Sequence, residues 1–251
     1  VVELQEVVVH FIGDAVLVIF GAPTAHGDDA RRAVACAVAM QLAMGEVNGR
    51  NAALGLPALE MGIGINTGEV VVGNIGSERR AKYGVVGRHV NLASRIQAFT
   101  IGGQVLASHA TLAAAGEGVL VDASFEVLPK GSIRPMRLFD ITGVDGNELP
   151  RRATALVPLA KPIEVRFGVL DGVRVPDPDH TGSITHLSPR EARLVAPAKL
   201  AILNTLKLEL AASDDGAGDV YAKVLRADGD GRWLLRFTSV SPAIERAVAA
   251  L

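Results

Sequence analysis

Residues 59–99, LEMGIGINTGEVVVGNIGSERRAKYGVVGRHVNLASRIQAF, decide how the first half of the chain folds. Apolar residues alternate with small ones over residues 59–65, and residues 69–75 form a second run rich in β-forming residues. Residues 66–68, Asn-Thr-Gly, have the composition of a turn. This pattern predicts a β-hairpin, which we expect a basic loop at residues 77–82 to follow.

A helix is predicted directly after Gly87. Asn91 and Arg95 stand four residues apart, so a helix projects both polar side chains from one face. Three apolar or small residues can pack inward from another face: Val90, Ala93 and Ile96. The helix therefore presents an amide and a guanidinium together.

Length and composition bound the architecture and the partners. With 251 residues, of which 49% are hydrophobic and 21% charged, the chain is long enough for two domains with proper cores. Its 25 basic and 27 acidic residues are nearly balanced and form no basic block, so we expect no nucleic-acid binding. No uninterrupted apolar run reaches the roughly 20 residues that span a bilayer, so no membrane span is expected.

Cys36 is the only cysteine, which excludes an intrachain disulfide and a cysteine metal cluster. A reducing compartment fits this composition, and we expect a cytoplasmic location. The start of the chain resembles neither a signal peptide nor an initiator methionine, so we expect a fragment of a longer protein.

A hairpin is also predicted near the start of the chain. Two β-rich runs, residues 7–12 and 15–21, flank Gly13-Asp14, which places Asp14 at the hairpin tip. Aspartate favours turns by bonding its own backbone, so Asp14 by itself is either a turn former or a ligand.

The remaining pattern predicts two domains, residues 1–146 and 151–251, with the boundary in the polar, turn-rich segment 143–152. In the first domain we expect a helix at 30–47, a surface loop at 49–57, a small helix at 110–115, and strands at 104–107, 120–128 and 136–142. In the second we expect short strands at 163–167, 182–184, 192–195, 205–210, 220–225 and 233–237, then a helix at 243–251. Short strands at this spacing indicate a small closed barrel.

Three phrases in the first half resemble the catalytic domain of the class III adenylate and guanylate cyclases. They are GDAVLVIFGAP at residues 13–23, GINTGEVVVGNIG at 64–76 and VNLASR at 90–95, and the similarity extends over residues 1–142. The resemblance implies an α+β, ferredoxin-like core, an antiparallel sheet with covering helices. The family's F-x-D-x-x-G-F-T phrase is absent, so we expect its first strand and first metal carboxylate to be missing.

The resemblance also implies roles for individual residues. Asp14 would be one of two carboxylates that hold a pair of Mg²⁺ or Mn²⁺ ions, which prefer oxygen ligands. Asn91 would orient the ribose, and Arg95 would meet the α-phosphate in the transition state. Lys130, in a Pro-Lys-Gly turn, would bind the triphosphate tail.

Arg79 and Arg80 could reach the β- and γ-phosphates, or could equally be solvated loop charges. His10 and Gly84 occupy the family's two base-reading positions, where neither discriminates ATP from GTP. We expect ATP on the family's base rates, with GTP second.

The second half resembles a PilZ domain, chiefly in Arg151-Arg152, in residues 184–188, Ile-Thr-His-Leu-Ser, and in the closing Leu-Arg-Phe-Thr of residues 235–238. PilZ domains that bind cyclic di-GMP use R-x-x-x-R and D/N-x-S-x-x-G. This chain has Ala155 and Leu156 where the second arginine would fall, and His186 and Glu191 at the ends of the other motif. We therefore expect the barrel without cyclic di-GMP binding.

These observations together predict an adenylate cyclase in bacterial second-messenger signalling, which converts ATP to 3′,5′-cyclic AMP and pyrophosphate. Because the family builds each site from two facing domains, a domain that carries both residue sets implies a homodimer. The alternative is a catalytically inactive cyclase-homology domain that serves as a nucleotide sensor or dimerisation scaffold.

Overall fold

The structure is a computed structural model that describes residues 8–77, 80–128, 134–150, 155–170, 177–210, 220–229 and 231–240. The chain divides into two compact units, Val1–Arg151 and Arg152–Leu251. Each unit is described by itself.

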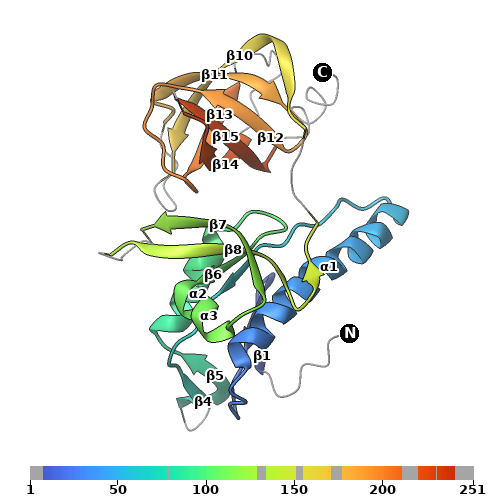
Figure 1. Ribbon diagram of the computed structural model, residues 1–251, viewed down its shortest axis with the longest axis vertical. Helices are drawn as coiled ribbons and strands as arrows, with labels where there is room; N and C mark the ends of the chain where they lie inside the picture. Colours follow the sequence, from blue (N-terminus) through green and yellow to red (C-terminus); the bar gives the residue numbers. More distant parts are fainter. Residues whose placement is uncertain are drawn as a thin grey trace. The chain divides into compact units, whose positions relative to one another are not determined.

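Within its described residues, the first unit combines strands and three helices (Figure 1). Its elements are β1 (Val8–Ile12), β2 (Ala15–Ile19), α1 (Asp29–Ala53), β3 (Ile63–Ile65), β4 (Val71–Ser77), β5 (Arg80–Val86), α2 (Arg88–Phe99), β6 (Val105–Ser108), α3 (His109–Ala115), β7 (Val119–Val127), β8 (Met136–Val144) and β9 (Asn147–Glu148). Helix α1 begins one residue before the predicted start and continues to Ala53, so the first part of the predicted 49–57 loop is helical.

The central sheet of this unit has the strand order β3-β6-β8-β7, with β9 paired to β8. Strand β3 runs parallel to β6, with Ile63 opposite Val105, whereas β6, β7 and β8 pair antiparallel. The chain between β3 and β6 contains α2, the kind of crossover that parallel neighbours require. The α+β class with covering helices is confirmed, and the sheet is mixed where an antiparallel one was expected.

The predicted hairpin between residues 59–65 and 69–75 is wrong. Strand β4 pairs instead with β5, with Val71 opposite Val86, and this pair forms a separate two-stranded sheet. Much of the predicted basic loop therefore belongs to strand β5. The reason is local, because the β-forming run at residues 83–86 lies close enough along the chain to capture β4, which leaves β3 to pair with β6.

The two faces of β3 and β6 meet different helices. Val105 and Ala107 join the buried cluster that contains Val34 and Val38 of α1. Side chains alternate along a strand, so Leu106, which is fully buried, points to the opposite face. Helix α2 lies against that opposite face, because a Cβ atom added at Gly64 of β3 would meet the backbone of α2.

The first hairpin forms as predicted. Strands β1 and β2 pair antiparallel, and the pairing of Ile12 with Ala15 leaves Gly13 and Asp14 as the two-residue turn. Gly13 has a φ of 64°, in the left-handed region that glycine adopts without strain. The hairpin is a two-stranded sheet of its own.

The second unit is a closed six-stranded barrel, as predicted, with the order β10-β11-β12-β15-β14-β13. Its strands are β10 (Val157–Val169), β11 (His180–Leu187), β12 (Glu191–Val195), β13 (Thr205–Leu210), β14 (Val220–Ala227) and β15 (Arg232–Ser239). Alternate residues fill the interior, among them Phe167, Leu206 and Leu208, which are fully buried. The predicted helix at 243–251 lies outside the described residues.

None of the helices in the described ranges is long and apolar enough to cross a membrane.

Candidate functional site

Asp14 lies at the tip of the β1–β2 hairpin, and its side chain is exposed. No hydrogen bond or ion pair joins its carboxylate to another described residue, so its oxygens face solvent. The described part of the chain gathers no group of three or more His, Cys, Asp or Glu residues that could hold a metal ion. Asp14 therefore offers the hard oxygen donors that Mg²⁺ prefers, but as a single carboxylate.

His10 lies on β1, opposite Leu17 of β2. Its Nε2 atom is buried and has no hydrogen-bond partner among the described residues. A buried polar atom without a partner costs free energy, so this nitrogen has a hydrogen bond to offer. Whether it donates or accepts depends on the tautomer of the ring.

Asn91 and Arg95 project from helix α2, one turn apart, and both side chains are exposed. Neither makes a hydrogen bond or ion pair with a described residue. Ile96, which follows them, is fully buried. The helix thus buries one face and leaves an amide and a guanidinium uncommitted on another, as the sequence pattern predicted.

The structure describes only some of the remaining predicted site residues. Gly84 lies on β5, opposite Gly73 of β4. Arg80 begins β5, but its side chain lies outside the described part of the structure. Arg79 and Lys130 lie wholly outside the described residues.

The described site residues occupy three separate elements. His10 and Asp14 share the β1–β2 hairpin, Gly84 lies on the β4–β5 hairpin, and Asn91 with Arg95 lies on α2. No hydrogen bond or ion pair between described residues links these three groups. The arrangement offers a carboxylate for a cation and a guanidinium with an amide for a phosphorylated sugar.

Asn66 was interpreted from the sequence as part of a turn, but its side chain reaches helix α2. Its Nδ2 atom lies 3.1 Å from the carbonyl oxygen of His89 and 3.2 Å from the ring atom Nδ1 of the same residue. In the sequence, Gly62, Gly64 and Gly68 lie on either side of Asn66. The structure explains their spacing, because helix α2 packs against this segment.

In the barrel, the residues of the altered motif make bonds within the protein. The Ser188 hydroxyl accepts hydrogen bonds from the backbone N–H groups of Arg190 and Glu191, at 3.3 and 2.9 Å. Glu191 is buried, and its carboxylate accepts a hydrogen bond from Arg236 at 3.4 Å. The segment is therefore a turn held by its own hydrogen bonds.

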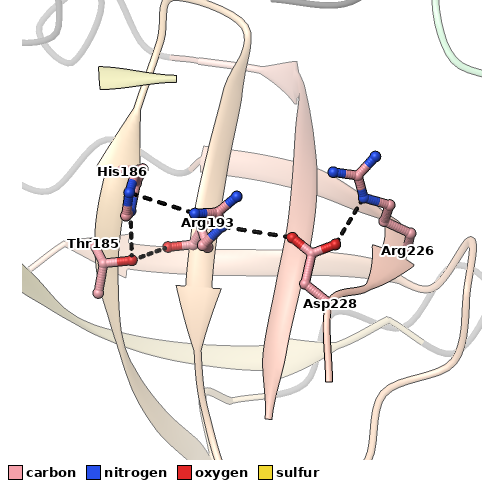
Figure 2. A network of polar contacts seen from close by, with 5 residues as sticks. All are labelled: Thr185, His186, Arg193, Arg226 and Asp228. Atoms are coloured by element: carbon pink, nitrogen blue, oxygen red, sulfur yellow. Dashed lines mark hydrogen bonds and ion pairs between the residues drawn. The ribbon is translucent and has the colours of Figure 1, made fainter. Parts of the chain in front are cut away.

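Beside this turn, a chain of polar contacts crosses the barrel from β11 to the end of β14 (Figure 2). The Nδ1 atom of His186 lies 3.1 Å from the Thr185 hydroxyl, and its Nε2 lies 3.4 Å from Arg193. Arg193 pairs in turn with Asp228 at 3.5 Å, and Asp228 also pairs with Arg226 at 2.7 Å. Because the Thr185 hydroxyl donates to the Arg193 carbonyl, these contacts fit a neutral His186 with its proton on Nδ1.

Comparison with known proteins places the first unit among the purine nucleotide cyclases. Residues 4–137 match the family model described as the adenylate and guanylate cyclase catalytic domain. Among curated proteins, the chain is 32% identical over 139 residues to Adenylate cyclase 1 of Rhizobium meliloti, a match that covers 55% of this chain and 21% of that protein. The chain thus spans about a fifth of the length of this relative.

Two solved structures are similar to the same region. The crystal structure of the guanylyl cyclase Cya2 superimposes with a TM-score of 0.56 at 55% sequence identity, and covers 57% of this chain and 75% of that one. The crystal structure of the adenylyl cyclase CyaB from P. aeruginosa gives a TM-score of 0.53 at 31% identity, with coverages of 56% and 74%.

Proposed function

This chain belongs to the adenylate and guanylate cyclase catalytic domain family, and from that membership we propose that it is the catalytic part of an enzyme that converts ATP to 3′,5′-cyclic AMP and pyrophosphate. The observation that carries the proposal is the pair Asn91 and Arg95, which stand exposed and uncommitted on one face of α2. They stand within the phrase VNLASR, which resembles the family's own.

The reaction attacks the α-phosphate with the ribose 3′-hydroxyl and expels pyrophosphate. Negative charge spreads over the phosphate oxygens as the bond to pyrophosphate breaks, so positioned cations and donors lower the barrier. Arg95 supplies such a cation, and it donates hydrogen bonds in a planar fork that matches phosphate oxygens. Asn91 orients the ribose so that its hydroxyl approaches in line.

Asp14 is the residue of this chain that would hold Mg²⁺ or Mn²⁺. Its carboxylate suits a hard cation, but one carboxylate leaves most coordination positions to the nucleotide phosphates and to oxygens outside the described residues. Two bound ions would favour the deprotonated hydroxyl and neutralise charge on the leaving pyrophosphate. Lys130, Arg79 and Arg80 are proposed for the same triphosphate tail.

GTP is a second candidate substrate. The identity of 55% to the guanylyl cyclase Cya2 exceeds the 31% to the adenylyl cyclase CyaB, and this favours GTP. At the base-reading positions, Gly84 has no side chain to contact a purine. His10 offers one buried nitrogen, which can donate or accept according to its tautomer, so it pairs with either base edge.

The catalytic unit is proposed to act as a cytoplasmic homodimer, with Asp14 from one subunit and Asn91 with Arg95 from the other. The barrel is proposed as a regulatory or docking module that does not bind cyclic di-GMP. In support, residues of the altered binding motif are already bonded within the protein, through Ser188 and the pair of Glu191 with Arg236.

The test measures cyclic nucleotide formation by the full-length protein from ATP and from GTP, with Mg²⁺ or Mn²⁺. Asp14→Ala and Arg95→Ala should each lower kcat by about a hundredfold or more, because each removes a charge that acts on the reacting phosphates. The matched controls are Asp122→Ala and Arg137→Ala, which remove exposed charges from β7 and β8 of the same unit.

Product from GTP alone would reassign the substrate. No product from either nucleotide by a correctly folded protein would favour the inactive sensor or scaffold, and full activity in Asp14→Ala would remove that residue from the site.

A further inference from the structure

Helix α2 rests directly on the segment around β3, where three glycines lie against the helix. A Cβ atom added at any of three glycines would overlap an atom of the helix or of the residue that ends it. The pairs are Gly62 with Thr100, Gly64 with Gln97, and Gly68 with His89. A side chain at Gly64 would meet the helix backbone, whereas one at Gly62 or Gly68 would displace the side chain of Thr100 or His89.

The face of α2 that meets this segment lies opposite the face that carries the proposed catalytic pair. Gly64 would contact the backbone of Ala93 and Gln97, one turn apart on the helix. Arg95 follows Ala93 by two residues, which is about 200° around an α-helix. Residues 62–68, with their three glycines, therefore set how far Asn91 and Arg95 lie from the sheet.

The first turn of α2 is held in an unusual way. Its N-cap residue, Gly87, has no side chain to cap the helix, and the first turn contains no acidic residue. This end of the helix therefore has neither a side-chain cap nor an acidic residue to favour its dipole. Two backbone bonds to the Gly87 carbonyl, from Val90 at 3.2 Å and Asn91 at 3.5 Å, begin the helix.

Asn66 holds the first turn from outside the helix by a bond of another kind, to a carbonyl oxygen and not to the free N–H groups of the N-terminus. Its Nδ2 group donates to the His89 carbonyl oxygen at 3.1 Å and lies 3.2 Å from His89 Nδ1. Arg88 Nε lies 3.1 Å from the other ring nitrogen. A neutral imidazole accepts one hydrogen bond, so the His89 ring accepts from either Asn66 or Arg88 but not from both at once. The bond from Asn66 to the His89 carbonyl oxygen forms with either tautomer of the ring. The ring itself is seated against Gly68.

We propose that Asn66 is a positioning residue of the cyclase reaction, which holds the first turn of α2 through His89 seated on Gly68, and so aligns Asn91 and Arg95 with the nucleotide. This inference rests on the proposed function for its catalytic consequence. The contacts of Asn66 with His89, which we call the clamp, are a property of the folded chain and can be measured without turnover.

The first test compares Asn66→Ala with wild type by amide hydrogen exchange. Loss of the clamp should speed exchange in the first turn of α2 by about tenfold, the equivalent of one lost hydrogen bond. The matched control is Asn48→Ala, because Asn48 on α1 also donates to a backbone carbonyl, that of Leu59 at 2.9 Å, and accepts from the Leu59 N–H at 2.7 Å, so its bonds hold a segment other than α2. Equal exchange of that turn in the two variants would overturn the clamp.

The second test measures kinetics in the full-length protein. Asn66→Ala should lower kcat by about tenfold and change KM by less than about threefold, because misplacement of groups that act in the transition state lowers kcat first. Asn48→Ala should retain wild-type kcat. Absence of wild-type turnover would contradict the proposed function and leave the exchange result standing, whereas an unchanged kcat in Asn66→Ala would overturn the positioning role.

A pair of substitutions, at Gly68 and His89, independently tests whether the His89 ring packs against Gly68. Gly68→Ala should lower kcat by about tenfold or more, because its new Cβ displaces the His89 ring. His89→Ala in the same chain removes that ring and keeps the Asn66 bond to the backbone carbonyl, so the double variant should recover most of the lost activity. A double variant no more active than Gly68→Ala would contradict this packing, and if Gly68→Ala does not fold, recovery of folding by His89→Ala is the expected result.

Discussion

Three charged side chains lie next to one another on adjacent strands of the barrel, and all are buried. Glu191 of β12 pairs in register with Arg236 of β15, which pairs with Lys223 of β14. Their exposed fractions are 6%, 3% and 7%. Burial penalises the charged form of an amine, and it lowers the pKa of Lys223 from 10.5 to about 8.

This lowered pKa predicts how the stability of the barrel depends on pH. Between pH 8 and 10.5 the unfolded chain holds a proton on Lys223 that the folded chain has released, so the free energy of unfolding rises with pH across that window. The rise should reach at most about 3 kcal/mol. Denaturant unfolding followed by the fluorescence of Trp233, the single tryptophan, reports on the barrel.

Lys223→Met removes the titration and should abolish this rise. Lys199→Met, at an exposed position in the same unit, should retain it. A wild-type barrel whose stability, relative to Lys223→Met, stays constant from pH 8 to 10.5 would contradict the assignment.

At the scale of elements, Arg31 joins α1 to two other parts of the first unit. Its guanidinium donates to the carbonyl oxygens of Ala115, at 3.2 Å, and Glu117, after α3. It also pairs with Asp145, in the turn after β8, with an Nε to Oδ2 distance of 3.2 Å. One side chain thus fixes the long helix against a second helix and the end of the central strand.

Arg31→Met should lower the stability of the first unit by about 1 kcal/mol, because it removes hydrogen bonds to carbonyl oxygens that are only partly buried. Arg50→Met breaks an exposed pair with Glu46 on the same helix and should cost less than about 0.5 kcal/mol. The described helices all lie in this unit, so denaturant unfolding followed by far-ultraviolet circular dichroism measures the difference. Equal losses in the two variants would show that Arg31 is an ordinary surface charge.

At the scale of the whole molecule, we propose that the site is divided between two copies of the chain. Asp14 lies on the separate β1–β2 sheet and Arg95 on α2, and no contact between described side chains joins them. A two-fold dimer would bring the hairpin of one copy to the helix of the other and create two equivalent sites.

Mixing two inactive variants tests this division in the full-length protein. Asp14→Ala and Arg95→Ala homodimers each repeat one defect at both sites, whereas a mixed dimer has one intact site and one with both lesions. Random pairing makes half the dimers mixed, so activity should recover to about a quarter of wild type. No recovery when mixed dimers are demonstrated by differential tagging would place both residues in one subunit.

The sequence alone determined the features that depend on neighbours along the chain. Gly13-Asp14 between two β-rich runs predicted the hairpin tip, and the spacing of Asn91 and Arg95 predicted their shared helix face. The barrel strands followed from short alternating runs between turn residues. In each case the deciding interactions are local, so the pattern of a short segment contains them.

The tertiary structure decided which segments pair and which contacts support the face of α2 proposed to be catalytic. β3 pairs with β6 across more than one intervening element, and the hairpin predicted for β3 fails because β4 has a nearer partner in β5. Arg31 meets Asp145 at a separation of 114 residues, and Asn66 meets His89 at 23. Such contacts depend on which strand edges and helix faces remain unpaired after the local elements have formed. Several segments compete for these edges and faces, so the composition of one segment does not predict the outcome.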